Sequence, residues 1–391
     1  MSIGIDANNN IDPTLKGGGD ESVAIGHGAA AGIPPALINN VLVTNTQTTA
    51  IGSGADAGTT KGVTSTGATA IGSQAQAQNV QTTALGVSSL AFGANSTALG
   101  GSSQALSNNT TAVGQGAIAS GTNSIAIGTN AGAGDNVFTL ANGAFANANN
   151  TAIGTNALAG VAAAGQTNNT AIGFNAAANG VMTTAVGTNS FAAGSNSAAF
   201  GAGSSAGGPS GKNDPNTNLP IPFNTSNTTA IGVGAQAGST ADGQNNATAL
   251  GQAAQANALN ATALGQGAVA NFAGATAIGQ GAIANAINSV AIGQGSIASQ
   301  PNTVSVGAPG AERRVTNVAA GVNPTDAVNV GQLESALAGG PVVGGGGVTP
   351  AAITGLQNQI NGLAALTRRF RDESRQGVAA AVAMGSAPMP S

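Results

Sequence analysis

The sequence predicts a mainly-β protein whose body is a β-solenoid with 14-residue coils, followed by a short helical coiled coil. Three observations predict this fold class: a tripeptide that returns every 14 residues, a composition of small residues, and a heptad pattern after residue 349. The chain has 62 Gly, 2% aromatic residues, 6% charged residues and no Cys. Because large side chains are scarce, the chain can bury apolar surface only by stacking many thin layers.

The repeated tripeptide is Ala-(Ile/Leu/Val)-Gly, and in two runs its glycines follow one another at intervals of 14 residues. These glycines are Gly72, Gly86, Gly100, Gly114, Gly128, Gly251, Gly265, Gly279 and Gly293. Each unit holds two short alternating segments divided by Gly, Asn, Gln and Ser, which is the pattern of strands and turns. Two strands and two turns form one coil of a solenoid. We expect the glycines to lie at the turns, and Gly265 and Gly279 to have positive φ.

The strand before each glycine is apolar or small on both faces. In one unit Thr276 and Ile278 share a face and Ala277 takes the other, because side chains alternate along a strand. Two apolar faces predict two buried surfaces, which are the interior of the coil and a contact with another chain. Closed symmetry is the usual form of such an oligomer.

Some units are further apart than 14 residues, yet the repeat then resumes unchanged. The extra residues must therefore leave the coil as loops. The largest, about residues 202–228, contains Pro209, Pro215, Pro220 and Pro222. A ligand-binding loop and a tolerated surface insertion both fit this pattern.

Charge and residue types argue against several functions. Residues 1–312 hold three Lys against nine Asp and Glu, so the main body has no basic groove for nucleic acid. Residues 313–391 hold six Arg against four acids. The one histidine, His27, rules out a two-histidine metal site within a chain, and we expect it in a solvated loop. No apolar run is long enough for a membrane-spanning helix. We predict no catalytic residue, cofactor or metal.

The C-terminal part has a helical pattern. Thr349-Pro350 is a helix start with Pro at the first helical position, after a Gly-rich stretch. Ile353, Leu356, Ile360 and Leu363 follow at spacings of 3, 4 and 3, which is the alternation of a coiled-coil seam.

The 14-residue units and the segment Arg313–Leu333 together resemble the YadA-type trimeric autotransporter adhesins. The resemblance is strongest in the neck of that family. The matching neck residues are Arg314, Thr316, Asn317, Val318, Asp326, Ala327, Val328, Asn329, Gln332 and Leu333. The resemblance implies a trimeric, left-handed parallel β-roll head, and a neck that narrows it to a three-stranded coiled coil.

The expected organisation has five segments: irregular repeats in 1–60, the head in 61–311, the neck in 312–335, a Gly-rich linker in 336–348, and the coiled coil in 349–391. Residues 368–384 resemble the helix that opens the family's membrane anchor. The anchor's barrel strands are missing from this chain, so we expect the parent protein at the bacterial outer membrane and this chain itself to be soluble or extracellular.

Within the neck, we expect Val315 and Val318 to face the trimer interior. Asp326 fits a helix N-cap, with Asn329 at the third helical position, where a capping box usually has Glu or Gln. Arg314 and Asp326 could form a salt bridge with each other, or both could be fully solvated.

The expected function is that of a non-enzymatic, homotrimeric bacterial surface adhesin. It would attach to host matrix, host cells, other bacteria or abiotic surfaces, with self-association as a further mode, in virulence or biofilm formation. Two alternatives remain: a trimeric fibre of another assembly, such as a phage tail fibre, and an ice-binding solenoid that displays threonine ladders.

Overall fold

The fold is given by a computed structural model of the chain. The structure describes residues 2–3, 21–32, 36–38, 41–43, 45–58, 64–134, 147–213, 220–338 and 350–385. The chain divides into two compact units, Met1–Glu312 and Arg313–Ser391, which are described separately below.

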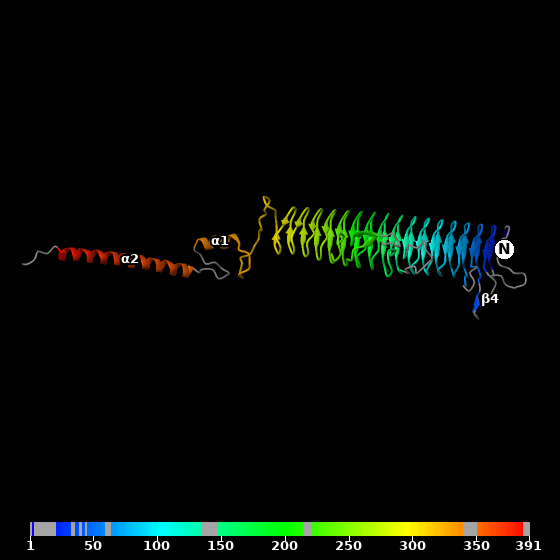
Figure 1. The fold of residues 1–391 in the computed structure, drawn as a ribbon, viewed down its shortest axis with the longest axis horizontal. Helices are drawn as coiled ribbons and strands as arrows, with labels where there is room; N and C mark the ends of the chain where they lie inside the picture. Colours follow the sequence, from blue (N-terminus) through cyan, green and yellow to red (C-terminus); the bar gives the residue numbers. More distant parts are fainter. Residues whose placement is uncertain are drawn as a thin grey trace, which may run out of the picture. The chain divides into compact units, whose positions relative to one another are not determined.

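The first unit is a solenoid with two facing parallel sheets, whose coils are stacked along one line (Figure 1). In the described residues the larger sheet has 18 strands and the smaller has 16. The larger sheet contains β1 (Ser2–Ile3), β2 (Val23–Ile25), β6 (Thr49–Ile51), β8 (Thr69–Ile71), β10 (Thr83–Leu85), β12 (Thr97–Leu99), β14 (Thr111–Val113), β16 (Ile125–Ile127), β18 (Thr151–Ile153), β20 (Thr170–Ile172), β22 (Thr184–Val186), β24 (Ala198–Phe200), β28 (Thr229–Ile231), β30 (Thr248–Leu250), β32 (Thr262–Leu264), β34 (Thr276–Ile278), β36 (Val290–Ile292) and β38 (Val304–Ser305). The smaller sheet contains β3 (Ala30–Ala31), β7 (Asp56–Ala57), β9 (Gln76–Ala77), β11 (Leu90–Ala91), β13 (Gln104–Ala105), β15 (Ile118–Ala119), β17 (Gly132–Ala133), β19 (Leu158–Ala159), β21 (Ala177–Ala178), β23 (Phe191–Ala192), β25 (Ser205–Ala206), β29 (Gln236–Ala237), β31 (Gln255–Ala256), β33 (Val269–Ala270), β35 (Ile283–Ala284) and β37 (Ile297–Ala298).

Each strand pairs in parallel with its equivalent in the next coil. Thr83 lies beside Thr97, and Leu85 lies beside Leu99. The partners are 14 residues apart in the regular coils, which confirms the predicted coil. The irregular N-terminal repeats belong to the same solenoid, because β2 pairs with β6 and β6 pairs with β8.

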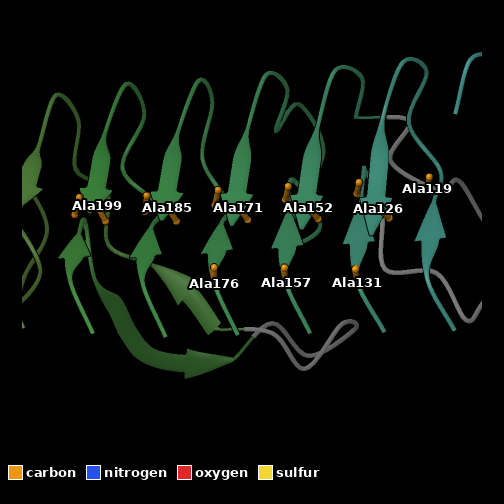
Figure 2. Packing of buried hydrophobic residues seen from close by; sticks show 14 of the residues in the cluster. Ala119, Ala126, Ala131, Ala152, Ala157, Ala171, Ala176, Ala185 and Ala199 are labelled. Carbon is orange, nitrogen blue, oxygen red and sulfur yellow. The ribbon is translucent and has the colours of Figure 1, made fainter. Parts of the chain in front are cut away.

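The core between the sheets is made of small side chains. The central residue of each three-residue strand in the larger sheet is fully buried, as Ala84 and Ala277 show, and the alanine that ends each smaller-sheet strand, such as Ala77, is buried as well. Figure 2 shows such alanines repeated from coil to coil between the sheets. A column of hydroxyl residues, including Thr82 and Ser96, is buried beside them. The predicted thin layers of small side chains are therefore present.

Two hairpins leave the solenoid where the repeat is interrupted. The first consists of β4 (Ala36–Ile38) and β5 (Val41–Val43), and the second of β26 (Pro209–Asn213) and β27 (Pro220–Pro222). The second hairpin is the largest insertion, expected over about 202–228. In the structure the insertion covers fewer residues than expected, because β25 pairs within the smaller sheet and Thr225 is again buried.

The second unit contains two helices, α1 (Val330–Leu337) and α2 (Pro350–Gly385). Residues 313–329 before α1 are irregular. Pro350 is the first residue of α2, as the sequence predicts, because proline lacks the N–H that has no partner at a helix start. The helix continues without a break through the segment 368–384.

Candidate functional site

The outward face of the larger sheet carries a continuous row of large apolar side chains, which we call the outer ladder. Its members are between 36% and 41% exposed in the single chain. They are Leu85, Leu99, Ile127, Ile153, Ile172, Phe200, Ile231, Leu250, Leu264, Ile278 and Ile292. Parallel pairing places neighbouring strands' members side by side, as for Leu264 and Ile278. The half-buried Val113 and Val186 complete the row, between Leu99 and Ile127 and between Ile172 and Phe200. The threonine two residues earlier lies on the same face, as for Thr276 and Ile278, so this face is the second apolar surface that the sequence predicts.

The repeat glycines stack at the end of each larger-sheet strand. All nine predicted turn glycines have positive φ, from +106° at Gly293 to +142° at Gly86. The positive φ expected at Gly265 and Gly279 is confirmed, with values of +136° and +128°. A Cβ on Gly265 would lie 2.5 Å from the carbonyl oxygen of Gly279. The glycine is therefore required both by backbone conformation and by the approach of the next coil.

The opposite turn of most coils carries an asparagine, and these form a ladder that the sequence analysis did not single out. These residues adopt left-handed φ, for example +56° at Asn95 and +57° at Asn109, and their side-chain amides join successive coils. Asn95 Nδ2 donates to Asn109 Oδ1 (3.1 Å), and Asn149 Nδ2 donates to Asn168 Oδ1 (3.1 Å). Asparagine tolerates this conformation better than other non-glycine residues. Its recurrence before the hydroxyl residue and Thr-Ala-Ile was the signal available in the sequence.

Met182 interrupts the asparagine ladder. It has φ +56° at the position of the ladder asparagines and is 55% exposed. We predict that Met182→Asn raises the stability of the head by about 1 kcal/mol per chain, because the strain of a left-handed methionine is relieved. Thermal unfolding followed by circular dichroism measures the change. Met182→Leu is the control and should give no increase; an increase of equal size in both variants would contradict the explanation.

All insertions leave the solenoid at the same place in the coil, on the same turn as the asparagine ladder. A glycine with positive φ follows the smaller-sheet strand in each coil that carries an insertion. These glycines are Gly32, Gly58, Gly134, Gly160, Gly207 and Gly238. Coils without an insertion have another residue there, such as Gln78, Ser120 or Asn257. The left-handed glycine turns the chain out of the coil, so the insertions gather on one edge, which we call the insertion edge.

In the neck, two amide side chains hold the irregular segment against the start of α1. Asn329 Oδ1 accepts from the N–H of Gln332 (3.0 Å), and Gln332 Oε1 accepts from the N–H of Asn329 (3.3 Å). The Gln332 side chain also bonds both backbone groups of Gly321, at 2.8 and 2.9 Å. Asn329 Nδ2 donates to the carbonyl of Val318 (3.1 Å). Gln332 is buried, although its neighbours are exposed.

The predicted N-cap at Asp326 is wrong. Asn329 is the N-cap of α1 and forms a capping box with Gln332 at the third helical position. The helix begins later than expected because the Asp326 carboxylate closes the preceding turn instead, where Oδ2 accepts from the N–H groups of Val322 and Asn323 (both 2.9 Å). The sequence Asn-x-x-Gln was the signal for this cap. Arg314 is exposed, and so are Val315, Val328 and Leu333.

Acid is expected to open the turn that Asp326 closes. The N–H groups of Asn323 and Val322 lower the pKa of Asp326, because they stabilise the ionised carboxylate. The contribution to stability is therefore present above the ordinary aspartate pKa of about 4 and is lost as pH falls through the lower folded pKa. The amide proton shifts of Val322 and Asn323 should titrate together in this acid range. Asp326→Asn should abolish that titration, and its persistence would contradict the assignment.

Replacing Gln332 should loosen the neck. Gln332→Ala removes the bonds to Gly321 and half of the capping box, at a local cost of about 1–3 kcal/mol. Amide exchange at Gly321 and protease cutting within 313–329 should both become faster. Glu334→Ala changes an exposed residue of the same helix and is the matched control. Equal rates in the two variants would mean that the Gln332 contacts contribute nothing to neck stability.

The seam predicted in the C-terminal helix lies on α2 without a partner in the single chain. Ile353 is 43% exposed, and Leu356, Ile360 and Leu363 are more exposed still. The spacing places these four side chains on one side of the helix. An exposed apolar seam of this kind is the contact surface of a coiled coil.

These features define a class of protein: a repeat-built β-solenoid head followed by a helical stalk segment. Family models match both parts. The YadA head domain repeat matches residues 64–89, 77–103, 105–131, 164–190, 178–204, 244–268, 256–282, 273–296 and 284–308. The coiled stalk of trimeric autotransporter adhesin matches residues 314–339. The chain belongs to the YadA-type trimeric autotransporter adhesins.

Comparison with solved structures found the collagen-binding domain of the Yersinia adhesin YadA. The identity is 21% over 66% of this chain and 84% of that chain, with a TM-score of 0.19. A search of curated proteins gave no match. In the described ranges no helix has the length and apolarity to cross a membrane. The same ranges contain no group of three or more His, Cys, Asp or Glu placed to hold a metal ion.

Proposed function

We propose that three copies of this chain assemble in parallel as a surface-displayed, non-enzymatic adhesin. The outer ladder is the observation that carries this proposal. A contiguous apolar surface of this length is unusual on a monomer and typically marks an interface. The exposed seam of α2 supports the same assembly, because a parallel coiled coil joins identical chains in register. The family to which the chain belongs is itself trimeric.

In such a trimer the outer ladders would cover one another, and the insertion edges and smaller sheets would remain for ligands. The ligand would be a host matrix protein, a host-cell surface molecule or another copy of the adhesin. Because equivalent surfaces recur from coil to coil and in three chains, many weak contacts act together on a repetitive ligand. Collagen, which the matched YadA domain binds, is the first matrix protein to test.

Light scattering on the intact chain tests the assembly. We expect a mass of three times 36.6 kDa at micromolar concentration, and a folded species of one chain mass would overturn the proposal. Adhesion is tested separately, with protein-coated beads on surfaces bearing collagen, cultured host cells or the protein itself. Albumin-coated surfaces are the control. Retention no greater than on albumin for all three would contradict the adhesive function.

A further inference from the structure

A cleft of about 310 Å³ lies on the insertion edge. One wall is the short insertion at Ala163–Ala164, and the other is the end of the large insertion at Phe223–Thr225. Asn179–Val181, Ala193 and Ser195 of the two intervening coils form the floor. The two insertions thus bound a site that neither forms alone.

Glycine opens the floor of this cleft. In seven other coils a polar side chain at the position of Gly180 donates to the backbone carbonyl thirteen residues later, whereas Gly93, Gly121 and Gly194 are glycines at this position, as Gly180 is. The donors are Asn45, Ser65, Asn79, Ser107, Asn147, Gln166 and Gln244. Gly180 has no such side chain, and a Cβ there would lie 2.7 Å from the carbonyl oxygen of Ala193. Among the described residues no donor reaches that carbonyl, although Ala193 is only 5% exposed.

Two hydroxyl residues line the cleft, and the oxygen of one of them is buried beside Gly194 and Gly207. Thr225 is 4% exposed, and its Oγ1 is buried without a hydrogen-bond partner. Buried hydroxyls are ordinarily paired, and an unpaired one costs free energy. Rotation about χ1 exchanges Oγ1 with Cγ2, and this exchange loses no existing hydrogen bond. The half-buried Ser195 provides a second hydroxyl on the floor.

The remaining lining is neutral and largely apolar. Phe223, Val181 and the methyl groups of the short insertion face the cleft, and no lining residue is charged. The side-chain oxygens of Gln166 and Asn179 are already used: Gln166 Oε1 accepts from Ala162 N–H (2.8 Å), and Asn179 Oδ1 accepts from Val161 N–H (3.2 Å).

We propose that this cleft binds one ring of a neutral carbohydrate. A pyranose offers hydroxyl donors to the Ala193 carbonyl, hydroxyls that pair with Thr225 and Ser195, and a C–H face for the Phe223 ring. A charged ligand would find no partner among the lining groups. The volume is near the lower end of small-molecule sites, which matches a single ring. The proposal rests on the adhesive function, since the sugar would belong to a glycan on the contacted surface.

Ligand-detected NMR on the intact protein tests the site with methyl glycosides of neutral hexoses and N-acetylhexosamines. We expect saturation transfer to at least one glycoside. Thr225→Val and Phe223→Ala should each weaken its binding about five- to tenfold. Thr225→Val should keep or raise the melting temperature, because it removes an unpaired hydroxyl. Ser96→Ala is the matched control, since Ser96 Oγ is also buried and unpaired but lies far along the solenoid.

The outcomes separate this site from the adhesive function. The sugar site would be overturned if saturation transfer reached no glycoside, or if Thr225→Val bound the glycoside as tightly as the parent. Surface adhesion that is unchanged in the Thr225→Val, Phe223→Ala double variant would leave the adhesive function standing and remove the cleft from it. Glycoside binding without surface adhesion would leave the sugar site standing and contradict the adhesive function.

Discussion

Replacing Gly265 with valine is expected to lower the stability of the head by about 2–6 kcal/mol per chain. Two effects add. The residue has φ +136°, a conformation that side chains other than glycine's rarely adopt, and its new Cβ would be 2.5 Å from the carbonyl oxygen of Gly279. That oxygen belongs to the backbone of the next coil, so it cannot move without displacing the coil. Thermal unfolding of the intact protein should show a clear decrease in Tm.

Gly267 gives a control two residues away. It also has positive φ, +62°, but a Cβ there meets no atom within 4 Å. Asparagine occupies the equivalent turn position at Asn175 and Asn189, with φ of +53° and +55°. Gly267→Asn should therefore leave Tm nearly unchanged. A similar decrease in both variants would show that general flexibility, and not the close approach of coils, is what these glycines provide.

A single charge on the outer ladder should prevent trimer formation around its coil. Ile292→Asp would place three carboxylates together in the proposed interface, where each ionised group costs several kcal/mol of desolvation without a partner. We expect light scattering and crosslinking to show a large loss of trimer, or a head that opens near residue 292 at much lower temperature. The isolated coil itself should tolerate the change, since Ile292 is 41% exposed in the single chain.

The other face of the same coil provides the matched variant. Ile297 belongs to the smaller sheet and is 38% exposed, so Ile297→Asp introduces the same charge at nearly the same exposure. It should leave the trimer intact. If Ile297→Asp dissociates the trimer and Ile292→Asp does not, then the smaller sheet and not the outer ladder forms the interface.

Much of the head follows from local rules in the sequence. The 14-residue interval requires equivalent residues to stack, and alternation along the strand separates Ala277, inside, from Ile278, outside. The repeat glycines indicate a backbone with positive φ, since few other residues adopt that conformation. The asparagine ladder and the capping box of Asn329 and Gln332 were also present as patterns, and we expected the cap at Asp326 because aspartate and asparagine serve equally well there.

The coil, the turn glycines and the start of α2 at Pro350 could be predicted from residues close together in the sequence. Which of the two apolar faces is the core, the alanine face, follows from burial in the folded chain. The polar groups that remain without partners could be identified only in the folded chain. The Thr225 hydroxyl is buried without a partner, and among the described residues no donor reaches the Ala193 carbonyl, because Gly180 lacks the side chain that donates in seven other coils. The edge from which the insertions leave could also be identified only in the folded chain. The Asp326 carboxylate could have capped a helix or closed the turn at Val322 and Asn323, and the structure shows that it closes the turn. In each case the result depends on distances between coils or turns in the folded chain, and residue spacing in the sequence does not give those distances.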